Sequence, residues 1–418
     1  MIITMRKKSK FLSVFLCVCL VLGGFVRNIE IMFQFQYYLF FISVVGFIYS
    51  AKRLNLKTLV LVTGGGVLFV FFVLKNVVEH GDYINDVTFG FYYIIMLFSV
   101  YGMMHILLIK HYIDFRLLIK LFITLNLIGL FGYAITFLLY DYSEVVVYWK
   151  YNVLHRSDIL NDIRSFVYAD EMYPRYNGFY IDPNRWSFCL LIQLIMSDYF
   201  FFDAKVITKR IKNILWGVVL LSMILTNSRA GIVSLIVYYV LTRRNIKTLG
   251  VMIFFALSVL FYLLYNPELM KLVAYKLTYG VSFTPSINDI SESRARINIW
   301  YNYLQYIFSD WVTILFGVNM ILDPSGTMGI TPHNLYIYSM YQGGLLLLFI
   351  VICFFTILYY KSSNLSKYLK YGTLAMIMMT FTEDYATLPI FWLYSFFIIL
   401  LYRDTKTNRD HVVGGCHE

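Results

Sequence analysis

The chain has 418 residues, of which 60% are hydrophobic, 19% aromatic and only 14% charged. A soluble globular domain carries about 25% charged residues, so this composition excludes nearly every soluble enzyme, and it also excludes a disordered or fibrous chain. We therefore expect one integral membrane domain over residues 1–418. The net charge of +11 does not indicate nucleic acid as a partner, because the Lys and Arg residues are spread over many short loops.

Apolar runs close to the length of a membrane span recur from one end of the chain to the other. A helix needs roughly 20 apolar residues to cross a bilayer. The pattern predicts an all-α polytopic membrane protein with about twelve transmembrane helices, some of them short for a perpendicular span. The runs cover residues 11–26, 31–50, 58–74, 87–109, 117–140, 186–202, 214–226, 230–241, 248–265, 334–360, 372–382 and 388–402.

The charges between these runs predict the orientation in the membrane. If the N-terminus is cytoplasmic, most of the 35 Lys and Arg residues fall in inner segments and most acidic residues fall outside. Both termini are then cytoplasmic. Two outer segments are long, residues 141–185 and 266–333. We expect the function there, because an enzyme that handles a large polar substrate needs structure outside the membrane to hold it.

Arginine on the outer side runs against the orientation rule, and the first such place precedes the run 186–202. Arg175 opens a segment in which Gly178 and Pro183 shape a turn, and Asp182 or Asn184 can cap the helix that follows. An outer Arg at a helix mouth is consistent with a bound anion. The structural alternative is a capped loop whose Arg reaches toward the lipid surface.

Two further places carry outer arginines. Residues 228–231 join two spans with almost no loop, so Arg229 lies at or just below the outer surface, where a guanidinium is costly without an anion. Arg294 and Arg296 open a segment whose apolar spacing predicts a half-buried helix along the outer surface, with Trp300 one turn after Arg296. The alternatives are a lipid headgroup contact or an ion pair for Arg229, and an interfacial anchor for the helix.

The fourth place is His333, with Asn334 and Tyr336, at the outer end of the run 334–360. We expect His333 to cap this helix mouth on the same side as the arginines. Converging guanidiniums suit a diphosphate, and a neutral imidazole suits removal of a proton from a sugar hydroxyl. His333 has no His or carboxylate neighbours at metal-ligand spacing, so no metal and no cofactor is expected.

These segments resemble the O-antigen polymerase and O-antigen ligase superfamily of bacterial envelope enzymes. Four motifs match in order, and one departure follows Gly317, where the family often has a second glycine. The resemblance implies a GT-C-like helical glycosyltransferase in the bacterial inner membrane, a periplasmic or extracellular active site and metal-independent transfer from an undecaprenyl-diphosphate donor. The motifs are R-x-x-G-x-x-x-x-P-N (Arg175, Gly178, Pro183, Asn184), S-R-A-G (residues 228–231), R-x-x-x-W (Arg296, Trp300) and H-N-x-Y with a later Gly-Gly (His333, Asn334, Tyr336, Gly343, Gly344).

We interpret the chain as a polymerase that joins lipid-linked oligosaccharide repeats into O-antigen or capsular polysaccharide. Its partners are then the undecaprenyl-diphosphate-linked oligosaccharide, the lipid bilayer and a chain-length regulator protein. Two alternatives stay open: a ligase that moves polymer onto lipid A core, and a lipid-linked oligosaccharide flippase. The long outer segments and the one-sided arginines argue against the flippase, whose charges should face a cavity midway through its spans.

The residues have separate roles in this interpretation. His333 is the base, although Glu171, Asp182 or Asp384 could take its place. The leaving diphosphate is bound by arginine side chains, and three polar residues support the site. The arginines are Arg175, Arg229, Arg296 and Arg294, and the supporting residues are Asn334, Tyr336 and Asn184.

Overall fold

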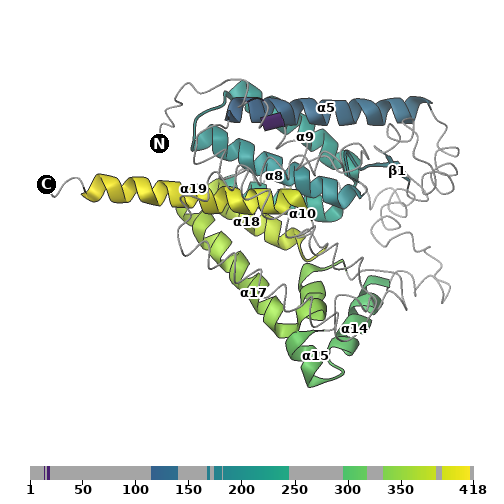
Figure 1. Cartoon of the computed structure of the whole chain (residues 1–418). Helices are drawn as coiled ribbons and strands as arrows, with labels where there is room; N and C mark the ends of the chain where they lie inside the picture. Colours follow the sequence, from purple (N-terminus) through teal and green to yellow (C-terminus); the bar gives the residue numbers. More distant parts are fainter. Residues whose placement is uncertain are drawn as a thin grey trace. The chain divides into compact units, whose positions relative to one another are not determined.

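The computed structural model describes residues 14, 17–18, 114–139, 167–169, 174–180, 182–243, 295–317, 333–382 and 388–414 (Figure 1). These residues are mostly helical, 85% of them, in agreement with the sequence. Two of the described helices, α5 (Phe115–Leu139) and α17 (Leu335–Leu365), contain stretches long and apolar enough to cross a membrane. The predicted spans at 31–50, 58–74, 87–109 and 248–265, and most of 11–26, lie outside the described residues.

The remaining elements follow the predicted order. The helices are α8 (Pro183–Phe202), α9 (Lys209–Thr226), α10 (Arg229–Arg243), α14 (Ala295–Ile307), α15 (Trp311–Phe316), α18 (Lys367–Met379) and α19 (Pro389–Gly414). Two short strands, β1 (Val167–Ala169) and β2 (Pro174–Tyr176), pair antiparallel, with Tyr168 opposite Arg175. This small sheet lies in the first long segment and corrects the all-α expectation.

The fold divides into two compact units. The first comprises Met1–Leu235, Phe355–Met379 and Tyr385–Glu418, and the second comprises Ile236–Phe354 and Thr380–Asp384. Helices α10 and α17 each contribute residues to both units.

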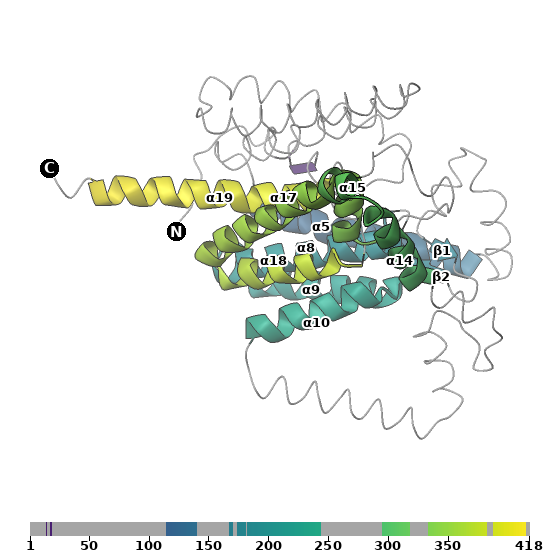
Figure 2. The same ribbon diagram turned by 90° about the horizontal axis from the view of Figure 1, so that it is seen from below.

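Helix α8 is the central helix of the first unit. It packs against α5, α9 and α18 (Figure 2), and every residue from Trp186 to Phe200 is buried. Ring contacts join it to α19, with Phe188 and Phe391 stacked at 6.5 Å between centroids. A helix that is covered on all sides by other helices belongs to the core of a bundle. Its first residues therefore provide a fixed platform for the candidate site.

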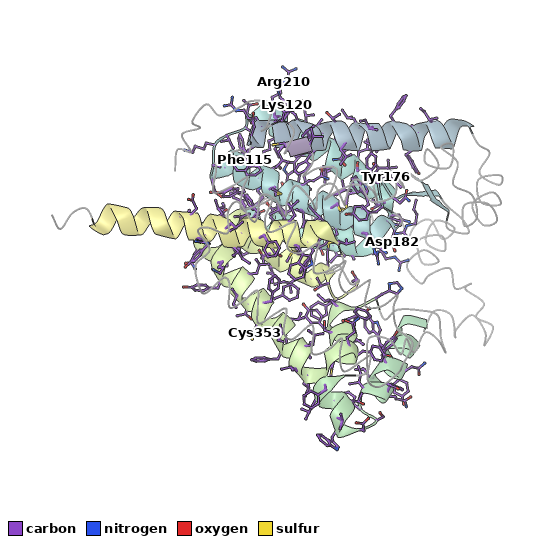
Figure 3. The ribbon with its side chains drawn as sticks, in the orientation of Figure 1. Phe115, Lys120, Tyr176, Asp182, Arg210 and Cys353 are labelled. Carbon is purple, nitrogen blue, oxygen red and sulfur yellow. The ribbon has the colours of Figure 1, made fainter. Side chains whose placement is uncertain are left out.

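Basic side chains gather at one end of the first unit. At the end where α9 begins, Arg116 Nε donates a hydrogen bond to the carbonyl of Val206 at 2.7 Å. Figure 3 shows Lys120 and Arg210 toward this end, and Tyr176 and Asp182 at the other. This end carries a set of exposed basic side chains from three segments of the first unit. They are Arg116, Lys120, Lys205, Lys209, Arg210 and Lys367.

The second unit packs α14 against the first part of α17. Tyr303 and Ile307 form a buried cluster with Tyr341, and the two tyrosine rings meet edge to face at 5.0 Å. The connection between α14 and α15 is apolar and exposed, with Phe308 and Trp311 more than half exposed. The predicted helix over the R-x-x-x-W motif is therefore present, and it is half-buried against α17.

Helix α17 is interrupted, whereas the sequence predicted one continuous span over 334–360. Gly343 and Gly344 leave the helical conformation, and Gly344 has a φ of +61°. Gly317, with a φ of +76°, lies against this break, because a Cβ there would come within 2.6 Å of backbone atoms of residues 342–344. Glycine is needed on both sides of so close a backbone approach. The apolar helix that follows the break begins at Leu345.

Candidate functional site

The segment that follows Arg175 wraps around a buried tryptophan. The rings of Tyr176, Phe179 and Tyr180 lie 5.7 to 6.3 Å from the Trp186 ring between centroids. Gly178 has a φ of +57° and passes so close to the indole that any side chain there would overlap it. This position thus requires glycine for both its conformation and its packing.

Helix α8 begins at the predicted place. Asp182 is its N-cap, with the carboxylate accepting a hydrogen bond from the backbone N–H of Asn184 at 2.6 Å, and Pro183 opens the first turn. Of the two capping residues that the sequence allowed, the structure selects Asp182. A carboxylate that is engaged as a helix cap is a weaker candidate for the general base.

Asn184 joins two of the predicted motifs. Its Oδ1 accepts a hydrogen bond from Ser228 Oγ at 2.9 Å, across 44 residues of sequence, and another from Arg175 Nη2 at 3.5 Å. Ser187 Oγ lies 3.0 Å from Ser228 Oγ. Both serines are buried. We call these four residues, Arg175, Asn184, Ser187 and Ser228, the Asn184 cluster.

Arg175 has a structural role that the sequence did not reveal. Its Nε donates to the carbonyl of Thr226 at 3.0 Å, and its Nη2 donates to the carbonyl of Asn227 at 3.5 Å. These carbonyls lie at the C-terminus of α9, where the helix itself supplies no donors and where a positive charge is favourable. Arg175 therefore fixes the turn between α9 and α10 against strand β2.

The S-R-A-G turn starts α10 beside the start of α8. Ser228 Oγ accepts a hydrogen bond from Gly231 N at 3.3 Å and so caps α10. Gly231 allows the two helices to meet, because a Cβ there would lie 2.6 Å from Ser187 side-chain atoms. Arg229 is the first residue of α10 and is exposed. An exposed guanidinium thus lies where two helix N-termini, each with a partial positive charge, converge.

Tyr176, within the same segment, stays neutral. Burial raises the pKa of its phenol, by more than the neighbouring Trp186 and Ser222 side chains lower it. The hydroxyl therefore keeps its proton at physiological pH. A phenol in this state is a poor general base.

His333 lies two residues before α17 in an unusual backbone conformation. Its φ is +47°, and among the described residues only Lys205 and Asn227 share a positive φ without being glycine. A left-handed conformation costs an ordinary residue roughly 1–2 kcal/mol, and such strain is concentrated at functional sites. The side chain is half-buried. The prediction that His333 caps this helix is wrong, because Asn334 is the cap.

Asn334 is the N-cap of α17 and also clamps a second segment. Its Oδ1 accepts hydrogen bonds from the backbone N–H groups of Tyr336 and Ile337 at 2.9 and 3.1 Å. Its Nδ2 donates to the carbonyl of Phe381 at 3.1 Å, and Leu335 N donates to the carbonyl of Thr380 at 3.0 Å. The start of α17 is thereby tied to the residues that follow α18.

Tyr336 completes this arrangement. Its ring lies 4.3 Å from the Phe381 ring between centroids, with the planes 34° apart, and its hydroxyl accepts a hydrogen bond from Thr380 Oγ1 at 3.1 Å. We call His333, Asn334, Tyr336, Thr380 and Phe381 the His333 cluster. Sequence reasoning missed Thr380 and Phe381 because it placed them inside the predicted span 372–382, whereas α18 ends at Met379.

The other predicted site residues are described only in part. Arg296 lies in α14 as expected, but its side chain is outside the described residues, and so are Arg294, Glu171 and Asp384. The structure therefore brings Arg175, Asn184 and the S-R-A-G turn together in the first unit. It brings His333, Asn334 and Tyr336 together in the second.

A buried ion pair inside the first unit was also missed. Asp198 is fully buried, and its Oδ1 lies 3.7 Å from Lys212 Nζ and accepts a hydrogen bond from Trp216 Nε1 at 3.0 Å. The Lys212 ammonium lies over the Phe202 ring at 4.7 Å. Lys212 lies between the predicted runs 186–202 and 214–226, but in the structure it belongs to the first turn of α9. This pair ties α8 to α9 at the end opposite the Asn184 cluster.

Comparison with protein-family models finds no match for this chain, and comparison with curated proteins finds none either. A functional assignment therefore depends on the geometry of the two clusters and on the resemblance of the four motifs.

Proposed function

We propose that this protein is a membrane glycosyltransferase that polymerises undecaprenyl-diphosphate-linked oligosaccharide repeats on the outer face of a bacterial cytoplasmic membrane. In this proposal about twelve helices cross the membrane, both termini are cytoplasmic, and residues 141–185 and 266–333 are outside. One observation carries the proposal. The sequence marks the Arg175 segment and the Arg229 segment separately as candidate anion sites, and the two segments share one hydrogen-bonded cluster through Asn184 and Ser228.

The arginines of this cluster have different tasks in the proposal. Arg229 is exposed at the start of α10, so its planar guanidinium contacts the diphosphate through two parallel hydrogen bonds. The adjoining N-termini of α8 and α10 add favourable potential for an anion. Arg175 acts mainly by holding the α9–α10 turn, and Arg294 and Arg296 are further proposed ligands of the diphosphate.

His333 is the proposed base. The acceptor hydroxyl oxygen forms a bond to the anomeric carbon of the donor, and its proton passes to the His333 imidazole. The bond between that carbon and the diphosphate oxygen breaks, and its electron pair leaves with undecaprenyl diphosphate. The arginines stabilise the negative charge that develops on this leaving group, which is the largest contribution expected in a water-poor site.

A surface-polysaccharide ladder gel, with lipid-linked intermediates extracted in parallel, tests the function in cells that lack the protein. We expect a single repeat on the surface anchor, and the same result when the cells carry His333→Ala. Long polymer retained on undecaprenyl diphosphate would instead identify a ligase. Single repeats trapped on the cytoplasmic face would identify a flippase and contradict the proposal.

A conservative substitution tests the role given to Arg229. Arg229→Lys keeps the charge but loses the planar fork, so we expect shortened polymer. Arg210→Lys is the matched control, because Arg210 is also exposed but lies at the opposite end of the first unit. Full-length polymer from Arg229→Lys would show that the bidentate contact is not needed.

A further inference from the structure

We propose that Phe381 and Tyr336 form a stacking platform for a sugar ring of the acceptor, beside His333. The inference rests on the proposed function, since it names the ligand of the same site. It starts from an exposed aromatic side chain whose position is fixed by two contacts. Phe381 is 52% exposed, its ring packs on Tyr336 at 4.3 Å, and its carbonyl accepts a hydrogen bond from Asn334 at 3.1 Å.

The surroundings of Phe381 differ from those of a lipid-facing phenylalanine. Phe349 on α17 is 64% exposed within a continuous stripe of exposed aliphatic side chains, which includes Leu345, Leu346 and Ile350. Phe381 has no such stripe, because between residues 367 and 382 it is the only exposed large hydrophobic side chain. The exposed ring of Phe381 therefore does not belong to a continuous apolar face like the one that α17 presents.

Polar groups beside the ring match the chemistry of a sugar. The Tyr336 and Thr380 hydroxyls lie 3.1 Å from each other at the edge of the platform. A pyranose presents a face of C–H groups, which pack on the negative face of an aromatic ring, and hydroxyls around its rim, which need hydrogen-bond partners. A site with one aromatic face and a few placed polar groups is typical for small ligands.

The platform also lies next to the proposed base. Asn334, which holds the Phe381 carbonyl, directly follows His333, and Leu335 N is bonded to the Thr380 carbonyl at 3.0 Å. These two hydrogen bonds hold the backbone of Phe381 against the two residues that follow His333. The platform would select the acceptor and orient its hydroxyl, while the diphosphate of the donor is bound elsewhere.

A kinetic experiment tests the platform. The full-length protein in nanodiscs is supplied with lipid-linked repeat extracted from cells that lack it, and KM for the repeat is compared with kcat. We expect Phe381→Leu to raise KM about three-fold to ten-fold with little change in kcat, and Phe381→Tyr to resemble the wild type. Phe349→Leu is the control and should change neither. An unchanged KM for Phe381→Leu would overturn the inference while leaving the polymerase intact.

A second measurement needs no catalysis, so it separates this inference from the proposed function. Phe381→Trp and Phe349→Trp each add one tryptophan, and their extra emission is recorded in vesicles with brominated acyl chains. We expect strong quenching for position 349 and weak quenching for position 381, whose emission should respond to repeat oligosaccharide released from its lipid. Strong lipid quenching at position 381 without a response to the oligosaccharide would identify an interfacial anchor and refute the platform. If the wild-type protein showed no polymerase activity but position 381 still responded to the oligosaccharide, the proposed function would be wrong and the sugar platform would stand.

Discussion

The Asn184 cluster and the His333 cluster use their polar side chains in different ways. In the first, the buried Ser187 and Ser228 and the guanidinium of Arg175 hold helix ends together through hydrogen bonds. In the second, Asn334 does the holding, and His333 sits beside it in a strained conformation with a half-buried side chain. The difference indicates that one motif can contain both residues that hold the backbone in place, such as Asn334, and a residue that is held for another role, such as His333.

The largest expected effect comes from a variant that removes the His333 imidazole but keeps the backbone conformation of this residue. Glycine adopts a φ of +47° without strain, so His333→Gly should fold at least as stably as the wild type. It should nevertheless lose about 10²-fold to 10⁴-fold in turnover, the usual contribution of a general base. Thermal unfolding in detergent and polymerisation of lipid-linked repeats measure the two effects.

Lys205→Gly is the matched control for this variant. Lys205 has a φ of +53° in the connection between α8 and α9, at the end opposite the Asn184 cluster. It should gain stability in the same way, by about 1 kcal/mol, and keep full activity. If both variants kept activity, His333 would belong to the framework, and the contrast between the clusters would disappear.

The Asn184 cluster should instead respond through stability. Gly178→Ala introduces left-handed strain of about 1–2 kcal/mol and an overlap with the Trp186 ring worth about 1–3 kcal/mol. We expect a loss of about 2–5 kcal/mol in unfolding free energy. Gly217→Ala in α9 is the control, since a Cβ there meets no atom within 4 Å, and it should be neutral or slightly stabilising. Equal stability of the two variants would show that the Trp186 packing does not support the site.

A smaller effect should follow from the side chain at the centre of that cluster. Asn184→Ala leaves the buried Ser228 hydroxyl without its acceptor, at a cost of about 1–3 kcal/mol. Asn184→Asp keeps an oxygen in place for both Ser228 and Arg175, so it should be milder. Denaturant unfolding compares the two variants. An aspartate variant as unstable as the alanine variant would mean that the Asn184 amide nitrogen, not its oxygen, matters.

The sequence predicted the parts of the site that depend on local rules. Pro183 after a capping Asp182 follows the general preferences of helix ends, and the connection between α9 and α10 is as short as expected. Gly178 was likewise expected at a turn, and its φ of +57° agrees with that expectation. Local chemistry of this kind is readable because it depends on only a few neighbouring residues.

What depends on distant contacts could not be predicted. Nothing near Arg175 in the sequence indicates that it caps the C-terminus of α9, 51 residues away. Thr380 and Phe381 were hidden inside an apolar run, because hydropathy does not show where a helix ends. The break in α17 was missed for the same reason, since a run of apolar residues reads as continuous through two glycines.

The smallest expected effect is a local response to acid in the second unit. Asp310 caps α15, and its hydrogen bonds from the Thr313 hydroxyl and from the backbone N–H groups of Thr313 and Val312 hold the pKa of this carboxyl below its usual range. A lowered pKa in the folded state means that the cap stabilises α15 above the ordinary pKa of about 4, and that this contribution is lost as the pH falls through the lowered value. Exchange of the Val312 and Thr313 amides, corrected for the intrinsic rate, should therefore accelerate in acid. Asp310→Asn, which caps without titrating, should abolish that dependence.

Because α15 is followed by Gly317 at the break in α17, the acid effect should spread to amides of the His333 cluster before those of the Asn184 cluster. Simultaneous loosening of both clusters would show that one framework, and not two, supports the site.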